Sequence, residues 1–439
     1  MKKRVLIYGM NYAPEIAGVG RYSGEIGEHF ASLGHEVCVI TTPPHYPGWQ
    51  AQGVHSANRW TKESLAGATV FRCPLYLHTE MKGVRRLLAP LTFAMSSAPV
   101  AFWQILTRRP EVVLAIEPTL VVAPAALLAA KIVGAKTVLH VQDLEIDAAF
   151  AVGHLGKGGM LAKFAGLFER TVMAGFDRVI TISHRMAAKI VDKGVAPSRI
   201  AVVRNWVDLD MIRPVDSSSA YRAELGLSPN DFIVLYSGNI GAKQGVRLLI
   251  DAARQLAGVP NVVFVIAGQG PMRPGVERAA EELPNLRILD FQPEHRFSDF
   301  LSIADLHVLP QERDTADLLL PSKLGGMLAS GRRILATADP DTELSQFLGA
   351  SCVFTAPGDA KAMAMAITEI VQSPYSKDQE VERLGRAQSL AKNTVIQTFS
   401  DAALCFHDRT TEGPKQPRPK YVATVDSPIQ TKKHDSLQN

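Results

Sequence analysis

Short runs of β-branched and aliphatic residues alternate with amphipathic segments along most of this chain. Such runs predict buried strands of a parallel sheet, and the segments between them have helical spacing. We therefore predict an α/β protein with doubly wound parallel sheets covered by helices. The expected strands fall into two sets: 4–9, 37–41, 69–73, 111–116, 136–141, 177–182 and 200–204, then 232–238, 261–268, 286–291, 306–310, 332–337 and 351–355.

A polar, turn-rich segment at 207–219 separates the two sets of strands. We therefore expect two Rossmann-like domains, one over 1–207 and one over 208–375. The length of 439 residues also favours more than one domain, because a single hydrophobic core rarely extends that far. From 409 to 439 the chain is rich in proline and polar residues without periodicity, which predicts a disordered tail.

The first expected strand leads into a loop that contains Gly18 and Gly20, and then into a helix. Gly34 is a natural stop for this helix, whose expected apolar face consists of Tyr22, Ile26, Phe30 and Leu33. Loop glycines let the backbone approach a ligand closely, and a helix N-terminus offers N–H groups to an anion. The loop lacks the GxGxxG pattern of dinucleotide-binding proteins, so the sequence disfavours an oxidoreductase but allows a phosphate-bearing ligand.

The overall composition is that of an ordinary globular protein, with 46% hydrophobic and 21% charged residues. The start MKKRVLIYGM has an apolar run too short for an export signal, so we expect a cytoplasmic protein. The four cysteines lie far apart without a CxxC pair, which predicts buried free thiols at Cys38, Cys73, Cys352 and Cys405.

Charge is distributed unevenly between the two halves of the chain. Residues 1–207 hold 23 Lys and Arg against 14 Asp and Glu, whereas residues 208–408 hold 18 against 26. This asymmetry predicts that one face of the first half meets an anionic surface, and the alternative is chance clustering on solvated faces.

The segment 82–109 is apolar over about the length of a membrane span, but prolines and serines interrupt it and basic residues flank both ends. We do not expect it to span a membrane. One interpretation is a helix at a membrane surface with Phe93, Phe102 and Trp103 inserted and basic residues on lipid phosphates. The other is a pair of buried core helices that cover a sheet.

Three further segments, taken with the opening, resemble the retaining glycosyltransferases of family 4, which have the GT-B fold. They are YSGNIGAKQGVRLLIDAA (236–253), VFVIAGQGP (263–271) and LPSKLGGMLASGRRILAT (320–337). VVRNWVD (202–208) resembles the interdomain turn of that family, and the resemblance covers residues 1–405 in order. It implies a central cleft between an acceptor-binding first domain and a second domain that binds a nucleotide-sugar donor. It also implies that helices over 376–408 return to the first domain.

The chain departs from the family pattern at several motif positions. Asn239 stands where the family has arginine, Gln244 where it has lysine, and Leu318 and Gly326 where it has the two glutamates of E-x7-E. The GNIG and PSK motifs are instead similar to a subgroup that acts in capsule, O-antigen and colanic-acid assembly. This similarity implies transfer of a hexose, specifically fucose from GDP-fucose, to a lipid-linked saccharide. It places the enzyme at the anionic cytoplasmic face of the inner membrane, without a metal, another cofactor or a nucleic-acid partner.

Transfer from a nucleotide sugar releases a diphosphate that gains negative charge, so the site needs cations and preorganised N–H groups. Lys323 opens a predicted helix after Pro321 and Ser322, and we assign it a catalytic role in stabilising the leaving group. Tight glycine loops supply the other candidates. The predicted donor-binding residues are Gly18, Gly20, Gly238, Asn239, Gly241, Lys243, Gly268, Gly270 and Ser322.

His140 is the catalytic candidate of the first domain. It lies at the carboxyl end of the run KTVLHV, where ligands of open α/β sheets bind, and the resemblance implies contact with the transferred sugar. The alternative is a structural histidine. Weaker candidates for acceptor binding are Glu15, His45, Tyr46 and Trp49, and the alternative for 43–49 is a proline-rich surface turn.

Two aspartate pairs imitate metal-binding motifs. Asp208 and Asp210 have D-x-D spacing but fall in the linker, which predicts a structural turn. Asp339 and Asp341 open a helix and predict an N-cap with proline. We therefore expect no metal site.

Two other functions stay open at this point. One is a GT-B sugar-nucleotide epimerase, which would release nucleotide without any acceptor. The other is a non-catalytic nucleotide-sugar-binding partner in assembly, which the missing E-x7-E glutamates make plausible.

Overall fold

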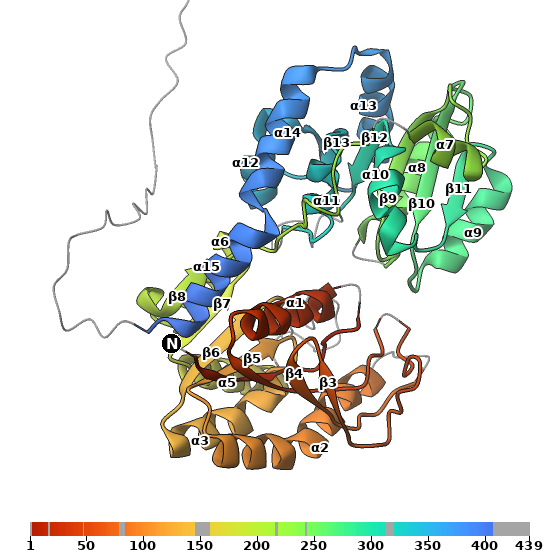
Figure 1. Cartoon of the computed structure of the whole chain (residues 1–439). Helices are drawn as coiled ribbons and strands as arrows, with labels where there is room; N and C mark the ends of the chain where they lie inside the picture. Colours follow the sequence, from red (N-terminus) through yellow and green to blue (C-terminus); the bar gives the residue numbers. More distant parts are fainter. Residues whose placement is uncertain are drawn as a thin grey trace, which may run out of the picture. The chain divides into compact units, whose positions relative to one another are not determined.

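The computed structural model describes residues 2–15, 18–46, 48–78, 84–144, 159–215, 218–241, 244–311 and 320–406 (Figure 1). The predictions for Lys243 and for the tail 409–439 lie outside these ranges. The chain up to Cys405 forms one compact unit that contains two separate sheets.

The first sheet has eight strands in the order β3-β4-β2-β1-β5-β6-β7-β8, and every neighbouring pair except β3–β4 is parallel. The antiparallel edge strand β3 was not predicted, because its sequence TKESL is polar and its side chains are largely exposed. The strands are β1 (Arg4–Tyr8), β2 (Glu36–Thr41), β3 (Thr61–Leu65), β4 (Ala68–Arg72), β5 (Val112–Glu117), β6 (Lys136–Val141), β7 (Arg178–Thr181) and β8 (Ile200–Val202).

Helices cover both faces of this sheet, with α2 and α3 side by side on one face and α1 on the other (Figure 1). In α1 the predicted apolar face is confirmed for Tyr22, Ile26 and Phe30, which are buried. Leu33 is exposed, and the helix ends at Ser32, one residue before it. The helices are α1 (Gly18–Ser32), α2 (Val84–Arg108), α3 (Ala123–Val133), α5 (Met160–Ala174) and α6 (His184–Asp192), with short 3-10 turns η1 (Leu120–Val122) and η2 (Pro197–Arg199).

The apolar segment 82–109 forms one helix, α2, that continues through both of its prolines. Phe93 is fully buried and its ring lies 6.0 Å from that of Tyr8, so the prediction that it inserts into a membrane is wrong. The helix is not a buried pair either, since Leu91, Met95 and Trp103 are exposed along its other side. Across the described residues no helix combines the length and the apolar character needed to cross a bilayer.

The second sheet is fully parallel, in the order β11-β10-β9-β12-β13-β14, and apolar clusters cover both of its faces. This confirms the doubly wound prediction for the second half. Its strands are β9 (Phe232–Ser237), β10 (Val262–Ala267), β11 (Leu286–Leu289), β12 (Leu306–Leu309), β13 (Arg333–Thr337) and β14 (Val353–Thr355). Its helices are α7 (Ser218–Glu224), α8 (Val246–Gln255), α9 (Arg273–Glu282), α10 (Phe297–Ser302), α11 (Leu324–Ala329), α12 (Glu343–Leu348), α13 (Ala360–Gln372) and α14 (Lys377–Ser389), with 3-10 turns η4 (Glu294–Arg296) and η5 (Gly349–Ser351).

The chain returns to the first sheet only in its last helix, α15 (Lys392–Leu404). Whereas α14 packs on α11 and η5, α15 contacts α1, β5 and β7. Between these two helices Ala391 forms a bridge with Val207, and Val207 N–H donates to the carbonyl of Leu390 over 2.9 Å. The two crossings of the chain between the halves are therefore hydrogen-bonded to each other.

All four cysteines are free thiols, as predicted. Cys38 and Cys73 are buried, and burial raises the pKa of the Cys38 thiol to about 11 and that of Cys73 to about 12. Such thiols are not reactive at neutral pH. The prediction that Cys405 is buried is wrong, because its side chain is exposed.

Candidate active site

Two glycine turns lie against each other at the carboxyl ends of β9 and β10. Gly238, Gly268 and Gly270 have φ angles of 135°, 142° and 155°, a region that side chains rarely adopt. A Cβ on Gly268 would lie 1.8 Å from the Gly238 carbonyl oxygen, and one on Gly270 would lie 2.4 Å from that of Ile240. Only glycine fits at these positions, because the two turns approach each other so closely. The sequence had pointed only to ligand binding as the reason for these glycines.

The side chain of Lys323 lies beside these turns, immediately before α11. Its Nζ is 3.8 Å from the centre of the Tyr236 ring, and a Cβ on Gly238 would lie 3.7 Å from it. Nζ is shielded from solvent and has no hydrogen-bond partner among the described residues. Burial lowers the pKa of Lys323 to about 7. A buried ammonium group without a counter-ion is suited to receive an anion.

Tyr236 and Asn239 shape the wall of this site. The Tyr236 hydroxyl donates to the Asn239 carbonyl over 2.6 Å, and a Cβ on Gly270 would lie 2.7 Å from Asn239 Oδ1. Gly241 is less constrained, since a Cβ there would lie 2.5 Å from Gln244 Oε1, the end of a flexible side chain. The structure thus brings together the predicted residues Gly238, Asn239, Gly241, Gly268, Gly270 and Lys323.

Ser322 is exposed next to Lys323 and borders a small pocket that Arg204 also lines. The prediction for residues 321–323 relied on the positive end of a helix dipole. Because α11 spans only six residues, its dipole is weak, and the positive charge of the site comes from Lys323 itself.

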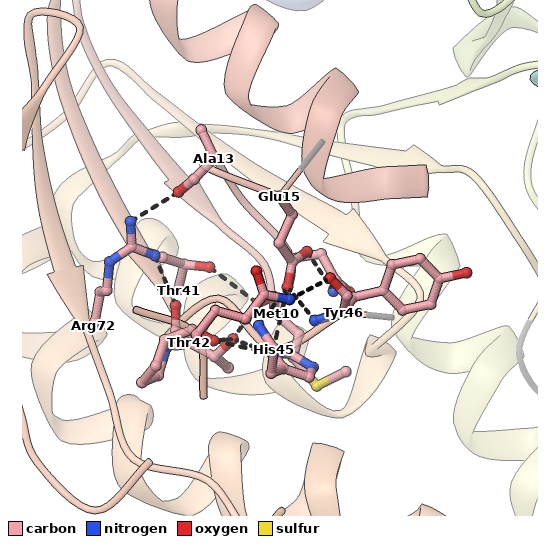
Figure 2. Close-up of polar contacts among 11 residues, drawn as sticks. Met10, Ala13, Glu15, Thr41, Thr42, His45, Tyr46 and Arg72 are labelled. Carbon is pink, nitrogen blue, oxygen red and sulfur yellow. Dashed lines mark hydrogen bonds and ion pairs between the residues drawn. The ribbon is translucent and has the colours of Figure 1, made fainter. Parts of the chain in front are cut away.

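In the first half, Glu15 is the centre of a buried hydrogen-bond network (Figure 2). Its Oε1 accepts the backbone N–H groups of His45 and Tyr46, each over 3.0 Å, and its Oε2 accepts from Asn11 Nδ2 over 2.9 Å. Both carboxylate oxygens are therefore engaged by the protein. Glu15 therefore fastens one loop to another, and its predicted contact with the sugar or acceptor stays a prediction.

The two glycines of the first loop serve the same network. A Cβ on Gly20 would lie 2.4 Å from Glu15 Oε2, so only glycine leaves room for the carboxylate. Gly18, with φ at 63°, has the Tyr46 ring as its nearest neighbour. Packing within the first half therefore accounts for both glycines, and their predicted donor contact stays a prediction.

The loop at 43–49 is held firmly rather than being a loose surface turn. His45 is fully buried, with Nδ1 3.1 Å from Thr42 Oγ1 and its ring 5.5 Å from that of Trp49. Arg72 on β4 donates to the carbonyls of Thr42 and Ala13 (Figure 2). The Tyr46 ring points away from this network in Figure 2, and its predicted contact with the acceptor stays a prediction.

His140 lies in the core rather than at an open edge. Only 1% of it is exposed, and its ring centre is 4.7 Å from that of Phe399 on α15. Burial lowers the pKa of His140 to about 3, so the imidazole is neutral at physiological pH. The catalytic role of His140 stays a prediction, but in this structure α15 covers the ring.

Comparison with known proteins identifies the family. The model "Glycosyl transferase 4-like domain" matches residues 17–206, and "Glycosyl transferases group 1" matches residues 217–388. The chain is also 39% identical over 410 residues to WcaI of Escherichia coli K12, a glycosyl transferase assigned to colanic acid biosynthesis. That match covers 90% of this chain and 98% of WcaI. The chain belongs to the family 4 glycosyltransferases.

Solved structures show the same fold at low sequence identity. Sucrose-phosphate synthase from Thermosynechococcus elongatus superposes with a TM-score of 0.71 at 15% identity, covering 91% of this chain and 98% of that chain. Anabaena Alr3699/HepE in complex with UDP and glucose superposes with a TM-score of 0.63 at 16% identity, again over 91% and 98%. The prediction of a transferase enzyme with the GT-B fold is confirmed.

The aspartate pairs of this glycosyltransferase form turns. Asp208 Oδ1 accepts the backbone N–H groups of Asp210 and Met211, over 3.1 and 3.2 Å, as the structural interpretation predicted. The N-cap of α12 is Thr342, which accepts from Ser345 N–H, so the prediction of an aspartate cap there is wrong. Within the described ranges no three His, Cys, Asp or Glu side chains gather in a metal-binding group.

Tyr236 is the site residue that sequence reasoning missed. It lies inside the apolar run of β9, where a tyrosine is indistinguishable from a core residue. Only the contact between its ring and Lys323 Nζ reveals a second role, because the ring face partly compensates a cation that has no hydrogen-bond partner in the part of the chain that the structure describes.

Proposed function

We propose that this glycosyltransferase transfers a hexose, with retention of configuration, from a nucleotide-diphosphate sugar to a lipid-linked saccharide of a surface polysaccharide. The observation that carries this proposal is the ammonium group of Lys323, which has no hydrogen-bond partner among the described residues and lies beside two glycine turns at the strand ends. A nucleoside diphosphate supplies the missing negative charge. The turns leave no side chain between the backbone and such a ligand.

In the proposed reaction the bond between the sugar C1 and the diphosphate oxygen breaks, and its electron pair leaves with that oxygen. An acceptor hydroxyl forms the new C1–O bond on the same face of the sugar, and its proton passes to the departing diphosphate. Lys323 donates to the diphosphate as charge develops on it. The bound anion also raises the pKa of Lys323 above its ligand-free value of about 7, so the ammonium form persists in the complex.

The identity of the substrates is argued from relatives. Similarity to WcaI over nearly its whole length supports an exopolysaccharide such as colanic acid, and we propose GDP-fucose as donor. The Anabaena protein of the same fold was crystallised with UDP and glucose, so UDP-sugars are the competing class. We propose that no metal takes part and that no nucleic acid is bound.

Incubation of the full chain with a panel of GDP- and UDP-sugars and a bacterial membrane lipid extract tests this function. We expect a single donor to yield a glycosylated lipid product, with the donor's anomeric configuration found by NMR in the new linkage. Nucleotide release that does not depend on the extract would favour the epimerase. Donor binding without turnover on any extract fraction would favour the non-catalytic partner.

We also propose that α2 carries the enzyme to an anionic membrane surface. Leu87, Leu91 and Met95 follow each other at four-residue spacing and are exposed, with Trp103 further along. Trp60 joins this row, since its Nε1 donates to the carbonyl of Ser96 over 3.2 Å; the five residues are the α2 patch. Exposed Arg59 and Lys62 lie next to Trp60 in the sequence. Aromatic and aliphatic side chains flanked by basic residues suit the interface of anionic lipids.

Flotation with liposomes tests the α2 patch. We expect binding to vesicles with anionic lipid at low ionic strength, weaker binding at high salt, and none to neutral vesicles. Trp103→Ser is expected to lower the partition coefficient about tenfold, because it removes one inserted aromatic side chain. The matched control is Met365→Ser on α13, which is exposed to a similar degree in the second half. Equal loss in both variants would contradict the α2 patch.

A further inference from the structure

A cavity of about 450 Å³ lies apart from the glycine turns, and its lining is rich in arginine. Arg185 follows β7, Arg204 follows β8, and Arg386 comes from α14. Glu343 and the ring of Phe347 complete the walls from α12. Arg185, Arg204 and Glu343 all stand just beyond the carboxyl ends of strands, where ligands of open α/β sheets bind.

Two carboxylates pair with the arginines of this cavity. Glu343 accepts from Arg204 Nη2 and from the backbone N–H of Arg185, each over 3.0 Å. Arg386 pairs with Glu382 over 2.6 Å and donates to the carbonyl of Phe347. These pairs occupy terminal nitrogens of Arg204 and Arg386 and do not involve the Nε atom of either side chain.

Two N–H donors of this cluster are left without an acceptor. Arg204 Nε and Arg386 Nε are shielded from solvent and have no hydrogen-bond partner within the described ranges. The guanidinium carbons of Arg204 and Arg386 lie 5.1 and 6.0 Å from the centre of the Phe347 ring, so one aromatic side chain supports both groups. The planar guanidinium groups of these two arginines, held in this way, match the paired oxygens of phosphate groups.

Arg204 also connects the cavity to the donor site. It borders the small pocket whose other walls include Pro321 and Ser322, the residues immediately before Lys323. A ligand in the arginine-rich cavity therefore lies next to the donor region without occupying the glycine turns. The proposed reaction brings two phosphate-bearing substrates together, and Lys323 accounts for only one of them.

We infer that this cavity is a second anion site, which holds the diphosphate group of the lipid-linked acceptor; the inference rests on the proposed function. Arg204 and Arg386 bind the phosphate oxygens through their free N–H groups. The acceptor saccharide then extends past Ser322 toward the donor sugar. Free pyrophosphate and the diphosphate of a nucleotide are the competing sources of such an anion, so the test must separate them from the lipid-linked acceptor.

Calorimetric titration of the full chain with inorganic pyrophosphate tests the cavity. The titration is made in a Lys323→Met background, so that the donor site contributes little. We expect binding that Arg386→Gln weakens about tenfold, as for loss of one charge-assisted hydrogen bond. Arg254→Gln is the matched control, since this arginine of α8 is exposed, pairs with Asp251 and lies outside the cavity. Equal binding by Arg386→Gln and Arg254→Gln would overturn the inference.

The source of the anion is decided by competition and by kinetics. A short prenyl diphosphate is expected to displace pyrophosphate from the cavity, whereas GDP and UDP are not. Steady-state kinetics of Arg386→Gln should show an about tenfold higher KM for the lipid-linked acceptor with the donor KM unchanged. A higher donor KM, or displacement by nucleotide alone, would overturn the acceptor assignment.

Folding of the variant is controlled separately, because Arg386 also donates to the Phe347 carbonyl. Arg386→Lys keeps the positive charge but loses the planar guanidinium group. We therefore expect its pyrophosphate affinity to lie between those of the wild type and Arg386→Gln, with the melting temperature of the wild type. If the loss of pyrophosphate affinity parallels the loss of melting temperature across the two variants, the role of Arg386 is structural and the proposed anion site is overturned. If Lys323→Met retains full donor affinity, the proposed function fails, while the effect of Arg386→Gln on pyrophosphate is still readable.

Discussion

Replacing Lys323 with methionine is expected to abolish most of the donor binding and turnover while making the ligand-free protein more stable. The ammonium group is buried without a hydrogen-bond partner among the described residues, and methionine keeps the chain length and the packing on Tyr236. Loss of one preorganised cation at a developing anion should lower kcat/KM about 10²–10³-fold. Removal of the buried charge should raise the melting temperature by roughly 1–3 °C. Steady-state kinetics and thermal melts measure the two effects.

The same lysine predicts a pH dependence with a definite sign. Burial lowers the pKa of Lys323 to about 7 from an ordinary value of 10.5, so the ligand-free group is charged below pH 7 and neutral above it. Because a polyanion binds the charged form, donor affinity should be level below pH 7 and fall up to about tenfold per unit above it. Between pH 7 and 10.5 the native state binds fewer protons than the unfolded state, so stability should rise with pH.

Calorimetry of nucleotide binding from pH 6 to pH 9 measures this dependence, and buffers of different ionisation enthalpy report the proton taken up. Lys323→Arg is the control that keeps a charge at every pH, so its affinity should be lower but level. Wild-type affinity in Lys323→Met, or a level profile in the wild-type protein, would contradict the role of this lysine.

Replacing Gly268 with alanine is expected to disrupt the donor site and to destabilise the second half. The new Cβ would lie 1.8 Å from the Gly238 carbonyl oxygen, and φ at 142° is unfavourable for alanine. Together these effects should lower the free energy of unfolding by about 2–5 kcal/mol. Chemical denaturation of the purified variant measures the loss, and nucleotide binding reports on the site.

Gly275→Ala is the matched control for this substitution. Gly275 lies on α9 in the same half, and a Cβ there meets no heavy atom within 4 Å. We expect stability equal to that of the wild type or slightly above it, since alanine favours helix. If Gly268→Ala has the stability and the nucleotide affinity of the wild type, the two turns can separate without loss and this prediction is contradicted.

The sequence was sufficient for the parallel strands of both sheets, because strands buried on both faces leave continuous apolar runs such as those of β5 and β10. It failed for β3, whose polar, half-exposed sequence has no such run. The end of α1 was also misplaced, since spacing alone extended the apolar face to Leu33. Patterning therefore finds strands that carry an apolar run, including the edge strands β8, β11 and β14, and misses an edge strand with a polar sequence.

The candidate site was predictable only in its residue types. Glycine turns and a lysine before a helix are visible in the sequence, and the structure brings them together. Glu15 accepts hydrogen bonds from a loop that lies far from it in the chain. Phe399, which covers the His140 ring, is likewise distant from His140 in the sequence. Contacts of this kind leave no local pattern, so the sequence could not show that both residues also make these internal contacts.

The late position of α15 has a consequence for synthesis on the ribosome. Phe399 is fully buried, with its ring 4.7 Å from that of His140 and 6.4 Å from those of Phe30 and Trp206. The ribosome therefore makes Phe399 only after the whole of the second half. The first half of the protein cannot complete this aromatic cluster until translation has passed that residue.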